Sequence, residues 1–178
     1  MVDLLISLSQ TPLALAMATS PWVVPTMQSI HIMSIAVIFV SILLIAMRVS
    51  GYAWGGVSVR QTVARFAPWA WVSLGLLALT GLVLILAEPI REIMAISFWI
   101  KMALLAVTLF ISIRFLRAVR RHEAFAEVDG PASPQMRRIA LVTVALLVII
   151  IFMGRFIAYD PLVWGSLSPI TSIYAGTV

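Results

Sequence analysis

The sequence predicts an all-α protein, an integral membrane four-helix bundle preceded by a short interfacial helical segment. Of its 178 residues, 62% are hydrophobic and 11% are charged, and the mean hydropathy is +1.11. These values are typical of membrane proteins and exclude an ordinary soluble domain. Four apolar stretches of about 20 residues are each long enough to cross a bilayer as a helix. The length fits a single transmembrane domain, residues 1–178.

The first 20 residues predict two short helices lying on the membrane surface. Pro12 interrupts this apolar stretch, and the Thr11-Pro12 pair is typical of an N-cap followed by the first helical position. The stretch imitates a signal peptide, but it contains Asp3 and no Lys or Arg before its apolar part. We therefore expect an interfacial segment, followed by Trp22 as a membrane-interface anchor.

The four predicted membrane spans follow in order. They are residues 27–47, 67–87, 93–113 and 139–159. The third span is expected to continue into water through its arginines, and a polar loop, 123–135, precedes the fourth. The tail, 160–178, contains two prolines and is expected to lie against the outer surface without spanning.

The arginines predict the orientation of these spans. On the side of the membrane that holds the termini, only Arg91 lies outside the spans. Nine arginines lie in the loops after the first and third spans, with their flanks: Arg48, Arg60, Arg65, Arg114, Arg117, Arg120, Arg121, Arg137 and Arg138. Positive residues stay on the cytoplasmic side, so we expect a multi-pass membrane protein with both of these loops cytoplasmic and both termini outside.

Polar side chains in the spans are the candidate functional residues. At about 1.5 Å per residue, His31 and Arg155 lie about 6 Å from the outer ends of their spans, Thr80 about 10 Å and Lys101 about 12 Å. Glu88 lies at the outer edge of the second span. Ionisable residues inside a membrane are costly and usually functional. Helical spacing places all five on inward stripes, which predicts one outward-facing polar pocket.

Each of these residues also has a structural interpretation. His31 could bond to a neighbouring helix, and Arg155 and Lys101 could extend toward the lipid headgroups. Glu88 is the only acidic residue on the helix faces that are expected to point into the bundle. We therefore expect its carboxylate to pair with Lys101 or Arg155. The stripe expected on the fourth helix is Val144, Val148, Ile151, Arg155 and Tyr159.

Six stretches, spread over most of the chain, carry a family resemblance: SPWVVPTMQSIHIMSIA, MRVSGYAWGG, ARFAPW, TGLVLILAE, FWIKM and GRFIAY. With them, the chain resembles a family of uncharacterised four-helix bacterial inner-membrane proteins, which implies a bacterial inner-membrane location with both termini periplasmic. The chain is also distantly similar to the membrane domain of copper-resistance protein D, a helical bundle with histidines near the outer face. This chain departs from that pattern because it has one membrane histidine and two membrane cations.

The first predicted function is a redox-associated membrane anchor that binds haem b or a quinone. His31 is then the axial ligand or the partner of the quinone, and Lys101 and Arg155 pair with propionates or the headgroup. Because b-type bundles normally use paired histidines, the second iron ligand has to be Met102, Met153 or His31 of a second copy. Such a site fits a homo-oligomer or a larger membrane complex.

Two alternatives stay open. In a copper-transport accessory, His31 is the metal ligand, and nearby methionines are soft donors for Cu(I), although the two cations oppose a metal. In a non-catalytic scaffold or lipid-binding subunit, the polar cluster holds a lipid phosphate or is purely structural. The methionines concerned are Met27, Met33, Met94 and Met153.

Other function classes are disfavoured. The spans contain no nucleophile–base pair or carboxylate dyad, and the sequence has no phosphate loop, so an independent enzyme is not expected. There is no cysteine, which excludes disulfides and thiolate metal sites. The arginines lie in short loops without a basic aromatic groove, so nucleic acid is not an expected partner.

Overall fold

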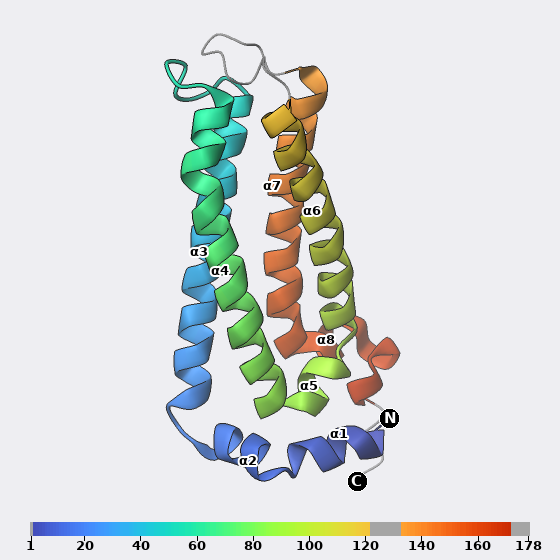
Figure 1. Ribbon diagram of the computed structural model, residues 1–178. Helices are drawn as coiled ribbons and strands as arrows, with labels where there is room; N and C mark the ends of the chain where they lie inside the picture. Colours follow the sequence, from blue (N-terminus) through green and yellow to red (C-terminus); the bar gives the residue numbers. More distant parts are fainter. Residues whose placement is uncertain (1, 122–132, 172–178) are drawn as a thin grey trace. The chain divides into compact units, whose positions relative to one another are not determined.

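The computed structural model describes residues 2–121 and 133–171, and Figure 1 shows their arrangement along the chain. The described residues form α-helices joined by short connections and two 3-10 turns, without a β-strand. This confirms the all-α prediction. The elements are α1 (Val2–Ser9), α2 (Pro12–Thr19), α3 (Val23–Val49), α4 (Val59–Ala87), α5 (Pro89–Ile93), α6 (Ile96–Arg121), α7 (Pro134–Phe156), η2 (Ile157–Tyr159), α8 (Asp160–Trp164) and η3 (Gly165–Leu167).

Four helices, α3, α4, α6 and α7, are long and apolar enough to cross a membrane. They include most residues of the four predicted spans and support a multi-pass membrane protein. Most of them extend beyond the predicted span because a helix can continue into a polar flank. Helix α4 begins early because Ser58 and Gln61 form a reciprocal capping box: the Ser58 hydroxyl accepts from the Gln61 amide at 3.2 Å, and the Gln61 side chain accepts from the Ser58 amide at 3.1 Å.

The short helices also have local causes. Thr11 caps α2, as predicted, because its hydroxyl accepts a hydrogen bond from the Ala14 amide at 3.3 Å. Pro89 occupies the first turn of α5, where its missing N–H removes no helical hydrogen bond. Because α5 ends at Ile93, the third long helix begins at Ile96 and not at residue 93 as predicted.

The chain divides into two compact units, which we describe separately. The first unit consists of Met1–Met33, Leu76–Ala103 and Ile150–Val178. In its described part, α1 contacts both α2 and α5. Its buried apolar cluster consists of Leu5, Met94, Ala95, Ile157 and Ile170. This unit therefore holds the N-terminal helices against α5, and it contains every residue of the predicted pocket.

The second unit consists of Ser34–Gly75 and Leu104–Ile149. Small polar residues are buried in it beside the apolar ones, including Ser41, Ser73 and Thr108. Small residues let helices approach closely where no water drives the packing. The apolar core cluster of this unit consists of Ile45, Ala46, Val49, Val59, Val63, Phe115, Val119, Met136 and Ala140.

Candidate functional site

The candidate site lies in the first unit, where His31 of α3 meets Thr80 of α4. The imidazole Nδ1 lies 2.8 Å from the Thr80 hydroxyl oxygen. His31 is half-buried, and Thr80 is only 4% exposed. The structure therefore brings these two predicted site residues together across two helices.

The hydroxyl of Thr80 also has a backbone partner. It lies 2.7 Å from the carbonyl oxygen of Leu76, one turn earlier in α4. When the single hydroxyl proton is donated to this carbonyl, the hydroxyl oxygen accepts from Nδ1–H of His31. In the neutral imidazole, this arrangement leaves the Nε2 lone pair free to accept a proton or bind a ligand.

Two glycines make room for the long polar side chains. A methyl group built at Gly81 of α4 lies 3.7 Å from Cε1 of His31, and one at Gly154 of α7 lies 3.5 Å from Nζ of Lys101. Both distances are ordinary van der Waals contacts. His31 therefore packs over Gly81, and the Lys101 side chain lies along α7 at Gly154.

Lys101 of α6 and Glu92 of α5 form the charged part of the site. Both side chains are half-buried, and their charges interact. Burial raises the pKa of Glu92 above its usual value of 4.5; the positive charges of Lys101 and Arg91 lower it, and the negative charge of Glu88 raises it. Lys101 also lies within electrostatic range of His31. The resulting polar cluster, defined as His31, Thr80, Lys101 and Glu92, involves four helices.

Glu88 does not occupy the position predicted for it. Its carboxylate pairs with Arg91, three residues later, and not with Lys101 or Arg155. The physical reason is the break between α4 and α5. Glu88 is the residue before Pro89 and has a non-helical backbone, so it leaves the inward stripe of α4. The next acidic residue, Glu92 on α5, lies within electrostatic range of Lys101 in its place.

Arg155 also lies outside the polar cluster. It is exposed, and its guanidinium stacks over the Tyr159 ring at 5.7 Å from the centroid. The predicted stripe of the fourth helix is wrong, because Val148, Ile151 and Tyr159 are exposed as well. The buried stripe is offset from it and consists of Met136, Ala140, Thr143, Leu147, Ile150 and Ile157. On this face, Gly154 and not Arg155 lies beside Lys101.

The sequence analysis missed the buried carboxylate Asp160. It is fully buried and accepts hydrogen bonds from the Ser97 amide at 3.0 Å, the Ser97 hydroxyl at 2.9 Å and the Ser168 hydroxyl at 2.7 Å. Trp164 donates in turn to the Ser97 hydroxyl at 2.8 Å. Because each of these donors finds an acceptor, the network ties the start of α6 to α8 and the segment after it. The signal in the sequence was the Asp160-Pro161 pair at the start of a helix.

The donor atoms of the cluster fit a metal poorly. No group of three His, Cys, Asp or Glu side chains among the described residues can hold a metal ion. His31 offers one imidazole nitrogen within electrostatic range of the Lys101 ammonium group, whose positive charge opposes a metal ion. A haem iron would find one axial nitrogen, held at its other nitrogen by Thr80 as is usual for a ligating histidine.

Comparison of the chain with protein-family models, curated proteins and solved structures found no match. The family resemblance of the sequence therefore stays a prediction. Inferences about function rest on the geometry of the polar cluster.

Proposed function

We propose that this chain is a redox-associated subunit of the bacterial inner membrane that binds a quinone or quinol headgroup at the polar cluster. The observation that carries the proposal is the contact of His31 Nδ1 with the Thr80 hydroxyl, which lies in turn beside the Leu76 carbonyl. It orients an imidazole inside a membrane span. A purely structural histidine needs no such orientation beside a half-buried lysine.

The chemistry of the cluster is complementary to a quinol or quinone ring. Nε2 of His31 can accept a hydrogen bond from a phenolic O–H, and the ammonium group of Lys101 can donate one to a ring oxygen. In its ionised form, Glu92 offsets the charge of Lys101. Burial raises the pKa of Glu92, and its protonated form can donate a hydrogen bond instead. Together these groups offer an acceptor and donors to a flat, lipid-soluble ligand.

The orientation belongs to the same proposal. Nine arginines flank the loops after α3 and α6, whereas Arg91 is the one arginine between α4 and α6. The positive-inside rule then places the polar cluster near the periplasmic side, with both termini in the periplasm. The chain carries no electron carrier of its own in this proposal, so it acts as an anchor within a larger membrane complex.

The test begins with full-length protein purified from its native membrane. We expect an organic extract to contain a quinone in stoichiometric amount. His31→Ala should lose it, because the only imidazole in the spans is removed. Lys101→Met should lower the occupancy by about tenfold, the value of a charge-assisted hydrogen bond. Arg155→Met is the matched control, since it removes the same charge outside the cluster and should retain the quinone.

Other outcomes of the same experiment contradict the proposal. A haem absorption spectrum that disappears in His31→Ala would assign the free Nε2 to an iron, with haem b as the ligand. Copper that co-purifies and disappears in His31→Ala would favour the copper-transport accessory. Wild-type protein without quinone, haem or copper, and with unchanged stability in His31→Ala, would favour the scaffold.

A further inference from the structure

The second unit carries a strong charge imbalance. Its described residues include no aspartate or glutamate and nine arginines: Arg48, Arg60, Arg65, Arg114, Arg117, Arg120, Arg121, Arg137 and Arg138. The acidic residues nearest in the sequence, Glu123, Glu127 and Asp129, lie outside the described residues. A surplus of positive charge of this kind attracts anions.

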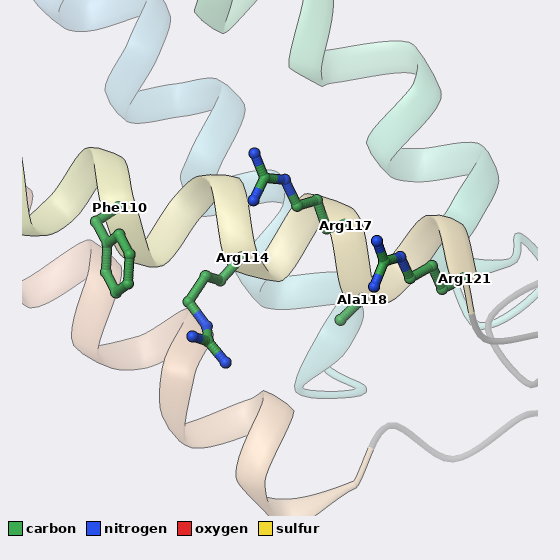
Figure 2. Close-up of a pocket in the computed structure, with 5 residues that line it drawn as sticks. All are labelled: Phe110, Arg114, Arg117, Ala118 and Arg121. Atoms are coloured by element: carbon green, nitrogen blue, oxygen red, sulfur yellow. The ribbon is translucent and has the colours of Figure 1, made fainter.

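Three of these arginines gather on one face of α6. Arg114, Arg117 and Arg121, with Phe110 and Ala118, line a cavity of about 390 Å³. Their spacing of three and four residues places them on one side of the helix. In Figure 2 the Arg114 side chain extends to the same side of α6 as Phe110, Arg117 extends to the other side, and Arg121 extends back along the helix. We call these five residues the arginine face.

The guanidinium groups of this face are available to a ligand. All three arginines are exposed. Arg114 lies over the Phe110 ring at 5.7 Å from the centroid, which leaves its edge N–H donors unused. Neither Arg117 nor Arg121 pairs with another side chain among the described residues. Since guanidinium binds phosphate with paired hydrogen bonds, the face suits more than one phosphate group.

The position of the face along α6 indicates a lipid and not a free phosphate. The apolar part of α6 ends at Ile113, and the arginines begin at the next residue. Phe110 lies within the apolar part and is 61% exposed. The cavity therefore has Phe110 at the depth of the lipid acyl chains and the arginines at the depth of the lipid headgroups. The distance from Arg114 to Arg121 along the axis is about 10 Å, long enough for two phosphate groups.

We infer that the arginine face binds an anionic phospholipid with two phosphates, of the cardiolipin type. Arg114, Arg117 and Arg121 contact the phosphates, and Phe110 contacts an acyl chain. This site lies on different residues from the polar cluster and does not depend on the proposed function. Basic pockets at the ends of membrane helices are suited to this headgroup.

The test measures lipid binding to the full-length chain in neutral detergent. Cardiolipin, phosphatidylglycerol and inorganic pyrophosphate are titrated separately, and bound lipid is counted by native mass spectrometry. We expect cardiolipin to bind more tightly than phosphatidylglycerol, and pyrophosphate to compete weakly because it lacks acyl chains. The triple variant Arg114→Gln, Arg117→Gln, Arg121→Gln should weaken cardiolipin binding by on the order of 100-fold, about fivefold for each arginine.

The matched control is Arg65→Gln, Arg120→Gln, Arg138→Gln. It removes the same charge from exposed arginines of the same unit that do not line the cavity, and it should bind cardiolipin within about threefold of wild type if geometry and not net charge decides. Equal losses in the two triple variants would overturn the site.

Two further results would also overturn it. Pyrophosphate that displaces cardiolipin at equal concentration would assign the face to a free phosphate compound. Cardiolipin binding only after Glu123→Gln, Glu127→Gln and Asp129→Asn would show that the chain's own acidic segment occupies the arginines.

Discussion

The carboxylate of Asp160 accepts hydrogen bonds from both the backbone amide and the hydroxyl of Ser97, 63 residues earlier in the chain. Replacing Asp160 by alanine leaves these donors, and the Ser168 hydroxyl, buried without an acceptor. We expect Asp160→Ala to lower the free energy of unfolding by about 3 kcal/mol, because each unsatisfied buried group costs about 1–3 kcal/mol. Unfolding in mixed micelles measures the change.

The control for this prediction is Glu88→Ala. Glu88 pairs with Arg91 at the surface, and an exposed ion pair of this kind contributes at most about 1 kcal/mol. A cost in Asp160→Ala no larger than in Glu88→Ala would show that the Ser97 network does not hold α6 and α8 together.

Thr80 is predicted to act by orienting His31. Thr80→Val keeps the shape of the side chain but removes the oxygen that accepts from Nδ1. We expect the quinone affinity to fall about fivefold, the value of one neutral hydrogen bond of about 1 kcal/mol, while His31→Ala abolishes binding. Thr108→Val, on α6 in the second unit, is the control because Thr108 bonds only its own helix. Full affinity in Thr80→Val would contradict the orienting role.

The raised pKa of Glu92 predicts how stability depends on pH. A carboxyl whose pKa is higher in the folded protein binds protons more readily there, so it stabilises the fold at low pH. This contribution is complete below the usual value of 4.5 and is lost as the pH rises through the folded-state value. We expect the melting temperature of wild type, relative to Glu92→Gln, to fall as the pH rises above 4.5.

Thr108→Val is the control for the pH series. It removes no titratable group, so its melting-temperature difference from wild type should stay constant over the same range. If the difference for Glu92→Gln stays constant with pH, Glu92 is not a titrating member of the polar cluster.

Gly154 is predicted to keep the Lys101 side chain in place. A methyl group there makes only an ordinary contact with Nζ, so Gly154→Ala should retain the quinone. Gly154→Leu fills the position of the ammonium group and should lower occupancy by about tenfold, as loss of the charge-assisted bond would. Gly75→Leu is the matched control, because no atom lies within 4 Å of its added Cβ. Occupancy is measured in extracts of the purified variants.

The orientation is tested with reporters inserted after Gly55 and after Gly130. The arginine bias predicts that both positions are cytoplasmic, so a reporter active only in the cytoplasm should be active at each. A fusion at the C-terminus should show the periplasmic signal. Periplasmic activity after Gly55 would reverse the orientation and move the polar cluster to the cytoplasmic side.

The sequence by itself determined the helical class, the four long apolar helices and the Thr11 cap. Span length and apolar content belong to a contiguous stretch, and the Thr11 cap and its partner lie three residues apart. The stripe of α3 was also predictable, because Ser34, Ile38, Ser41 and Ile45 follow helical spacing and are all buried.

The tertiary structure decided which polar residues meet. Successive residues on a helix differ by about 100° in direction, so the choice between Gly154 and Arg155 as the inward residue depends on how α7 packs against its neighbours. The break at Pro89 similarly exchanged Glu88 for Glu92 as the carboxylate near Lys101. Asp160 meets Ser97 only because segments far apart in sequence pack together. Burial and partner choice are properties of that packing, and no single span of the sequence contains them.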